Sequence, residues 1–260
     1  MSRDRVEKWE VTQRVGELTT SLSFAVELVD AYTGGRPAGS PTVALADQPV
    51  VALENPSGYH LFLDLTADPV DVVVDGGDRY FDERLTVYHS TPMPADASGV
   101  EVTDRSTPVE IELTPTPAFQ FSPGTTTIRG TVVDGTGAVV PDATVSLDGF
   151  TPTARTTGTG EFALLVPVTA ADVVRDGDGK RVTAPNGGST GGSSGNGPGN
   201  GPPGNGPPVG DEARPDPQLV VHHPDGSTAD TDLHVDAGRL TVLRLHLSGG
   251  SLTVDRLGVY

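Results

Sequence analysis

The sequence TIRGTVVDGTGAVVPDATVSLDG, residues 127–149, decides the fold expected for this chain. Two short runs rich in valine and threonine, Ile128–Asp134 and Thr144–Leu147, are separated by Gly and Pro residues typical of turns. A second turn, Thr157–Gly160, leads into Glu161–Leu165, in which Phe162 is a candidate core residue. This pattern predicts β-strands joined by tight turns, with Gly130 at a point where another backbone approaches closely.

The same order of strands and turns occurs earlier in the chain. In two of the three matching pairs the segments lie 102 positions apart. In the remaining pair, the aspartates that end the strands lie 104 positions apart. A length change confined to one turn is typical of duplicated modules. The matching pairs are Phe24–Asp30 with Ile128–Asp134, Thr42–Leu45 with Thr144–Leu147, and Gly58–Leu63 with Gly160–Leu165.

Further short apolar runs predict more strands and no βαβ units. They are bounded by Gly, Pro and Asp, which favours an all-β sandwich over a parallel α/β sheet. The runs are Val50–Leu53, Tyr59–Leu65, Val70–Val74, Leu85–Tyr88, Val109–Leu113, Gln218–His223, Leu233–Val235, Leu240–Leu247 and Leu252–Leu257.

The second copy is interrupted by a tract of Gly, Pro, Ser and Asn between residues 186 and 210. We interpret 175–217 as a disordered loop inserted into the second sandwich, because the strands after it are those the second copy lacks. An interdomain linker is the alternative. The predicted organisation is an N-terminal arm or short helix (1–20), a first sandwich (21–118), a second sandwich (125–250) and a C-terminal strand (251–260).

Residues 127–167 resemble the carboxypeptidase regulatory-like family, which has the transthyretin (prealbumin) fold. The resemblance implies two tandem transthyretin-like or Ig-like Greek-key β-sandwiches, the second interrupted by the loop. Residues 223–226, His-Pro-Asp-Gly, stand where that family usually has a glycine–aromatic pair. The first copy is similar to the same family more weakly, and also to small β proteins of phage-tail-like contractile injection systems. Modules of this family are usually appended to other functional proteins, and the resemblance therefore implies no catalytic role.

The chain is strongly acidic, with 35 Asp and Glu against 17 Lys and Arg and a formal charge of −18. Its only lysines are Lys8 and Lys180. This composition is typical of a halophile's intracellular proteins, since molar salt screens carboxylate repulsion to about 3 Å. Nucleic acid and anionic membranes are poor partners for such a surface. Without an apolar leader or a long apolar run, we expect a soluble chain that is cytoplasmic as synthesised, with release as part of a particle as the further option.

The sequence offers no set of residues for catalysis or metal binding. There is no cysteine, and no histidine has a glutamate three residues later, the zinc carboxypeptidase arrangement. His222 and His223 are neighbours on a strand and point to opposite faces. Residues 176–180 begin like a calcium loop, but Lys180 occupies a ligand position. We therefore predict no enzyme activity, no cofactor and no metal.

Five aromatic residues are candidates for an interaction surface: Trp9, Tyr59, Tyr80, Phe81 and Tyr88. Aromatic rings are frequent in contacts with proteins and sugars, although burial in the sandwich cores is the alternative. Composition and resemblance together predict a structural or protein-interaction protein that acts as a scaffold module beside other subunits. The alternatives are a subunit of a contractile injection particle and a carbohydrate-binding or adhesin-type module.

Overall fold

The computed structural model describes residues 20–176, 179–185 and 215–260, and this part of the chain is all-β, as predicted. One short 3₁₀ helix, η1 (Ala170–Asp172), stands among the described strands. The strands are β1 (Leu22–Asp30), β2 (Thr42–Leu45), β3 (Leu53–Glu54), β4 (His60–Leu63), β5 (Val70–Asp75), β6 (Glu83–Tyr88), β7 (Val100–Glu101), β8 (Val109–Leu113), β9 (Thr126–Asp134), β10 (Thr144–Leu147), β11 (Thr153–Arg155), β12 (Glu161–Val166), β13 (Val173–Asp176), β14 (Gly179–Val182), β15 (Gln218–His222), β16 (Thr228–Asp232), β17 (Leu240–Ser248) and β18 (Ser251–Val259).

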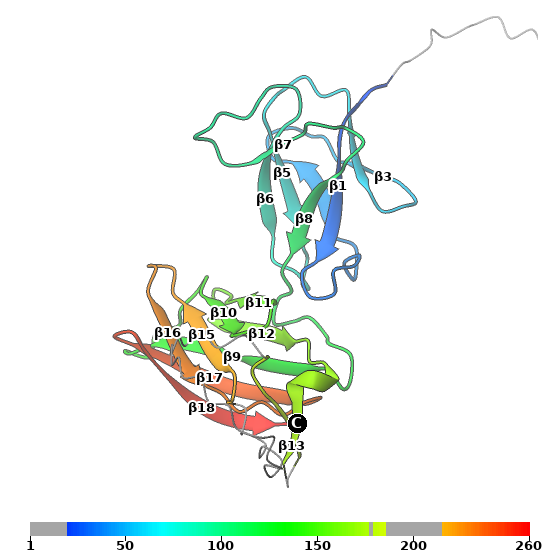
Figure 1. Cartoon of the computed structure of the whole chain (residues 1–260). Coiled ribbons are helices and arrows are strands. Elements are labelled where there is room, and N and C mark those ends of the chain that lie inside the picture. The colour runs from blue at the N-terminus through cyan, green and yellow to red at the C-terminus, as the bar shows by residue number, and fades with distance from the viewer. Residues whose placement is uncertain (1–19, 177–178, 186–214) are drawn as a thin grey trace, which may run out of the picture. The chain divides into compact units, whose positions relative to one another are not determined.

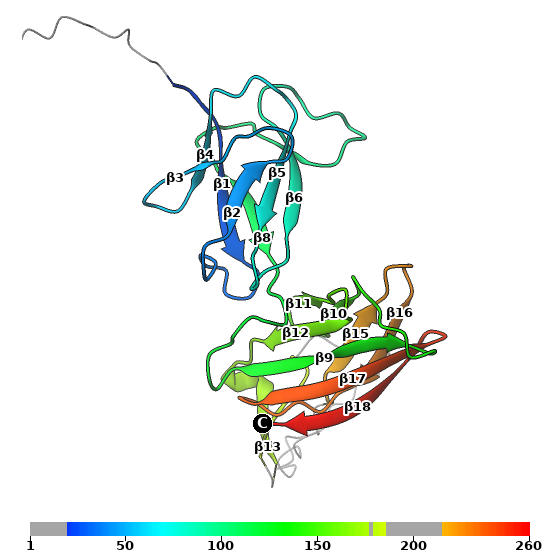
Figure 2. The ribbon, with the colours of Figure 1, turned by 180° about the vertical axis from the view of Figure 1, so that it is seen from behind.

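The strands form four four-stranded sheets and a separate two-stranded hairpin. The first half of the chain provides the sheets β3-β4-β1-β8 and β2-β5-β6-β7 (Figure 1). The second half provides β12-β9-β17-β18 and β11-β10-β15-β16 (Figure 2), with β13-β14 as the hairpin. Strand β15 pairs antiparallel with β10, and β17 pairs parallel with β9. Strands from before and after the Gly/Pro-rich tract therefore lie in the same sheets.

The two halves share the register of their strand pairs. Val26 of β1 pairs with His60 of β4, and Gly130 of β9 pairs with Phe162 of β12, at the spacings of 104 and 102 residues found in the sequence. The turn after each first strand is also the same, because Oδ1 of the last aspartate accepts a hydrogen bond from the backbone N–H two residues later. Asp30 accepts from Tyr32 and Asp134 accepts from Thr136, both at 2.8 Å.

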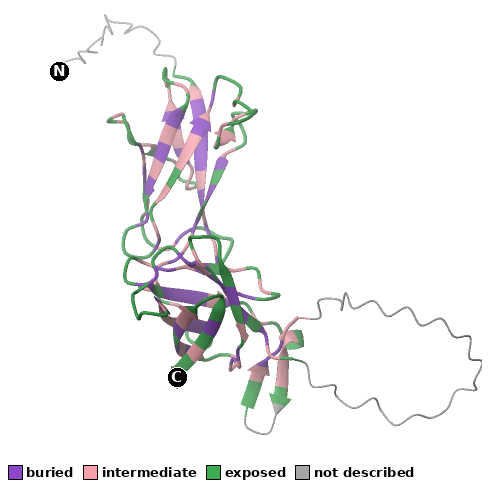
Figure 3. Cartoon of the chain, turned by 90° about the vertical axis from the view of Figure 1, so that its left-hand side faces the viewer, coloured by how far each residue is buried: buried purple, intermediate pink, exposed green. Residues whose placement is uncertain are grey.

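The core of the second half lies between its two sheets. Strands β10, β15 and β17 alternate buried and more exposed side chains, whereas β9 and β12 contain runs of three buried residues, and all five contribute buried side chains to this core (Figure 3). Phe162 is 1% exposed, as its position predicted. Each fully buried Leu or Phe side chain contributes on the order of 1.5–3 kcal/mol. The fully buried residues of this core include Ile128, Val132, Val145, Leu147, Phe162, Leu164, Leu219, Val221, Leu243 and Leu245.

Packing divides the chain into two compact units that differ from the predicted boundaries. The smaller unit contains the described residues up to Glu27, with Val43–Val73 and Arg84–Ile111. The larger unit contains Leu28–Thr42, Val74–Glu83 and Glu112–Tyr260. In the smaller unit, the Phe24 and Phe62 rings pack 4.9 Å apart.

Several predicted elements need correction. The predicted loop 175–217 includes β14, whose Val182 is fully buried in the second core, so the chain leaves the sandwich later than its composition indicates. Leu233–Val235 is buried but is not a strand, because β16 ends at Asp232. The strand predicted at Val50–Leu53 is reduced to Leu53–Glu54. The arm 1–20 with Trp9 lies outside the described residues, apart from residue 20. No helix in the described ranges is long and apolar enough to cross a membrane.

Candidate functional site

The structure buries one of the predicted surface aromatics completely. Tyr80 is 1% exposed, and its hydroxyl donates a 2.6 Å hydrogen bond to Oδ2 of Asp30 while accepting one from the Ala38 N–H at 2.8 Å. Burial and the hydrogen bond to Asp30 both raise the pKa of Tyr80 above its ordinary range. Tyr80 is therefore a core residue with a satisfied hydroxyl, and its assignment to an interaction surface is wrong.

Of the other predicted aromatics, Tyr59, Phe81 and Tyr88 lie in the described residues and are half-buried. Tyr59 and Tyr88 belong to the smaller unit, whereas Phe81 belongs to the larger one. The guanidinium of Arg155 lies over the Phe81 ring, and the distance from its carbon Cζ to the ring centroid is 4.1 Å. None of the ring contacts in the described part of the chain joins two of these residues. Within the described residues, no ring contact supports a shared aromatic surface.

Two adjoining cavities in the larger unit form the best candidate site. Both are open to solvent, with volumes of about 410 Å³ for the first and about 520 Å³ for the second, in the range of ligand-binding pockets. Gly124 and Gly238 line both cavities, so the two share this wall. Both glycines have positive φ, +84° and +76°, and a Cβ at Gly238 would meet the Gly124 carbonyl oxygen at 3.3 Å. The backbones therefore approach closely where the cavities meet.

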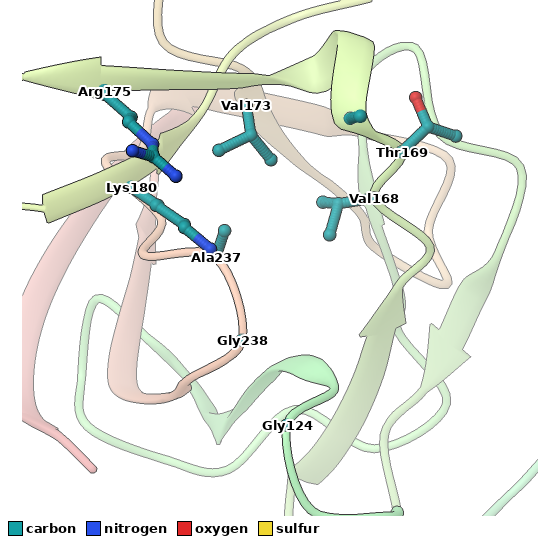
Figure 4. Close-up of a pocket in the computed structure, with 9 residues that line it drawn as sticks. Gly124, Val168, Thr169, Val173, Arg175, Lys180, Ala237 and Gly238 are labelled. Atoms are coloured by element: carbon teal, nitrogen blue, oxygen red, sulfur yellow. The ribbon is translucent and has the colours of Figure 1, made fainter.

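The first of these, which we call the cationic cavity, is lined by Arg175 of β13 and Lys180 of β14 (Figure 4). Both side chains extend from neighbouring strands into the opening, and both residues are exposed. Val168 and Val173 provide an apolar wall on the far side of the opening. The cavity therefore combines two positive groups with a small apolar surface.

The β13-β14 hairpin is held in place by backbone hydrogen bonds to the segment before β17. The Ala237 N–H donates to the Lys180 carbonyl at 2.8 Å, and the Val182 N–H donates to the Val235 carbonyl at 2.9 Å. Since Val182 is fully buried, the strand that carries Lys180 is fixed to the core. The position of the Lys180 backbone is thus determined by the sandwich.

The second cavity, which we call the aromatic cavity, is lined by Phe121 and Tyr260 together with hydroxyl and amide side chains. Tyr260 is 76% exposed, yet reciprocal backbone hydrogen bonds with Leu240 of 2.9 and 3.0 Å hold its main chain. Its ring lies against Gly258, where an added Cβ would come within 2.8 Å of ring atoms. An exposed ring on a fixed main chain is a suitable surface for stacking a flat, partly apolar ligand. The polar lining residues are Gln120, Ser122, Thr125, Thr127 and Arg129.

Arg129 positions the other ring of the aromatic cavity. Its guanidinium donates hydrogen bonds to the carbonyl oxygens of Pro117 and Phe119, and its carbon lies 5.3 Å from the Phe121 ring centroid. Phe121 also stacks with Tyr32, with ring centroids 5.8 Å apart. Burial lowers the pKa of Arg129, but an arginine remains charged at neutral pH.

His222, His234 and His246 lie in separate places. Nδ1 of His222 is 2.9 Å from Oγ1 of Thr228, whereas His246 is paired with Asp255 at 3.1 Å. His234 lies beside Asp216 and Asp236. In the described residues, no group of three or more His, Cys, Asp or Glu side chains is arranged to hold a metal ion.

Sequence reasoning missed the residues of both cavities. Arg175 and Lys180 fell at the edge of the predicted loop, and Phe121 fell in the predicted connection between sandwiches. A usable signal was present in the scarcity of lysine, because Lys180 is one of only two lysines in the chain. The convergence of these residues depends on tertiary packing, and no local motif marks it.

Comparison with known proteins leaves the family open. No family model matches the chain, and no curated protein matches it. Two crystal structures, each described as that of "a putative cell adhesion protein", align with this all-β chain. The one from Bacteroides uniformis has 11% identity and a TM-score of 0.29, covering 91% of this chain and 96% of its own. The one from Bacteroides ovatus has 10% identity and a TM-score of 0.24, covering 90% and 96%. With values this low, function has to be inferred from this chain's own residues.

Proposed function

We propose that this protein is a non-enzymatic binding module of the adhesin type, which binds a saccharide in the larger unit. The observation that carries the proposal is the common wall at Gly124 and Gly238, which places the aromatic cavity next to the cationic cavity. Rings offer the apolar surface on which the CH face of a sugar stacks. Hydroxyl and amide side chains at the same cavity offer hydrogen bonds to sugar hydroxyls.

The test is binding of the full chain to an array of neutral, carboxylated and sulfated glycans, followed by titration of the best ligand. Substituting Phe121→Ala and Tyr260→Ala together should weaken that binding at least tenfold. A matched control is Tyr59→Ala with Tyr88→Ala, which removes two half-buried rings from the smaller unit. Absence of binding to every glycan class, or equal binding by the Phe121/Tyr260 variant, would overturn the proposal.

A scaffold role is favoured by a different observation, the free edge of β18. This nine-residue strand is the outermost one of its sheet, and its Leu257 is 58% exposed. An outer strand with unpaired backbone groups can accept a strand from another subunit. If β18 joins subunits, the chain should elute as an oligomer, and Leu257→Asp should return it to a monomer. A monomer at all concentrations would exclude assembly through copies of this edge.

The contractile injection particle remains a prediction from sequence resemblance. Its test is the presence of this chain in purified particles, together with neighbouring genes for sheath, tube and baseplate proteins. A chain that copurifies with no such particle would contradict it.

A further inference from the structure

We infer that Arg175 and Lys180 form a carboxylate-binding subsite, so that the saccharide taken by the proposed site is an acidic one that carries uronic-acid-type groups. This inference rests on the proposed function and specifies its ligand class. Arg175 and Lys180 are direct partners in the antiparallel register of β13 and β14. Directly opposite residues of such a pair have Cβ atoms about 4.5–5.5 Å apart, and like charges at that spacing destabilise the hairpin. The pairing therefore needs a reason other than strand stability.

The surroundings of these two cations differ from those of nearby arginines. The guanidinium of Arg181, the residue after Lys180, lies 3.5 Å from Oδ1 of Asp216. The guanidinium of Arg256 lies 2.6 Å from Oδ2 of Asp236. Within the described ranges, no acidic side chain lies within ion-pair distance of Arg175 or Lys180. In a chain with about twice as many acidic as basic residues, two neighbouring cations that have no acidic partner among the described side chains are unusual. Such a pair would suit an external anion.

The geometry favours a carboxylate on a sugar ring. An arginine presents two N–H groups that match the two oxygens of a carboxylate, and a lysine adds a point charge. Val168 and Val173 leave an apolar wall for the body of a ring, while the aromatic cavity across Gly124 and Gly238 can accept the next ring. A peptide made only of Asp and Glu lacks the ring faces that would use Phe121 and Tyr260, so among purely acidic ligands the combined site favours a saccharide.

The experiment compares an oligogalacturonate with its fully methyl-esterified form, which has the same rings but no charge. Titration of both at constant ionic strength should give binding at least tenfold tighter for the acidic form. Arg175→Gln with Lys180→Gln should remove this preference, and Arg175→Lys should retain part of it. Arg105→Gln with Arg244→Gln changes the net charge equally at exposed positions outside these cavities and should keep the preference.

The outcomes separate this inference from the proposed function. Equal binding of both forms, lost on substitution of Phe121 and Tyr260, would overturn the carboxylate subsite and leave the saccharide site standing. A preference for sulfated glycans on the array over carboxylated ones would overturn the carboxylate assignment. A preference that the Arg105/Arg244 control loses as well would show a general effect of net charge and overturn it too. Failure of every glycan class to bind would overturn the proposed function itself.

Discussion

The hydroxyl of Tyr80 donates a 2.6 Å hydrogen bond to Oδ2 of Asp30, and both residues are almost completely buried. Oδ1 of the same carboxylate accepts from the backbone N–H groups of Tyr32 and Thr33 at 2.8 and 3.0 Å. Asp30, which ends β1, thus holds the turn that follows it and also binds the hydroxyl of a tyrosine fifty residues later in the sequence. Removal of the Tyr80 hydroxyl takes away the donor to Oδ2, whereas Oδ1 keeps its two backbone donors.

Substituting Tyr80→Phe should lower the free energy of unfolding by about 1–3 kcal/mol, because Oδ2 of Asp30 loses its donor while remaining buried. Urea unfolding at neutral pH measures the change. Tyr88→Phe removes a hydroxyl from a half-buried ring and should have an effect below about 0.5 kcal/mol. Equal losses for the two variants would contradict the assigned role of Tyr80.

Asp68 should make stability depend on acid pH. Burial alone would raise its pKa, but hydrogen bonds from Thr91, His89 and Ser90 outweigh burial and lower it from 3.8 to about 2. Because the folded pKa is the lower one, the carboxylate stabilises the fold above pH 4, and this contribution is lost as the pH falls towards 2. Its size is about 2 kcal/mol.

Asp68→Asn should therefore be less stable than the wild type at neutral pH, with the difference shrinking towards pH 2. Urea unfolding across this pH range gives the measurement. The exposed Asp148→Asn provides a control that should follow the wild type. A constant difference between Asp68→Asn and the wild type over the whole range would disprove the linkage.

Gly130→Ala should destabilise the second sandwich by at least about 1–3 kcal/mol through overpacking. A Cβ there would meet the Leu243 carbonyl oxygen at 2.5 Å and the Phe162 ring at 2.9 Å. Gly158→Ala is the matched control, since a Cβ at that exposed turn position meets nothing within 4 Å. Thermal unfolding of both variants should show a loss at Gly130 alone, and an unchanged Gly130→Ala would contradict the close approach.

The charge of −18 should make the chain more stable in concentrated salt. Raising KCl from about 0.1 M to about 1 M shortens the Debye length from about 10 to about 3 Å and screens repulsion among surface carboxylates. The urea midpoint should rise accordingly. Glu110→Gln with Glu112→Gln, both exposed on β8, should reduce this dependence. A midpoint that is insensitive to salt would contradict the halophilic interpretation.

Short-range patterns predicted most of the strands correctly. The runs Phe24–Val29, Thr42–Leu45 and Ile128–Asp134 lie within or match observed strands, because β-branched residues between Gly and Pro turns leave little other choice. Leu233–Val235 shows the limit of such patterns. Leu233 and Val235 are buried as the residues of a strand would be, and each makes a backbone hydrogen bond, but these bonds do not form a strand ladder. An apolar pattern in the sequence predicts that residues are buried, but buried residues do not always form a strand.

The candidate site could not be predicted in the same way. Tyr80 and Tyr260 are both aromatic residues near turns in the sequence, yet one is 1% and the other 76% exposed. Arg175 and Lys180 are five residues apart, and only the hairpin register makes them opposite one another. Phe121 and Tyr260 line one cavity although 139 positions separate them. Such distances carry no signal in local composition.

The sequence by itself determined that the chain is all-β, that its two halves repeat one pattern of strands and turns, and that its surface is acidic. These properties follow from turn chemistry, residue spacing and charge, each of which acts over a few residues or over the chain as a sum. Tertiary structure alone decided which aromatic rings are buried, which cations have an acidic partner among the described side chains and which cavities adjoin. Those features depend on strand register and on the close approach of Gly124 to Gly238, contacts made between segments far apart in the chain.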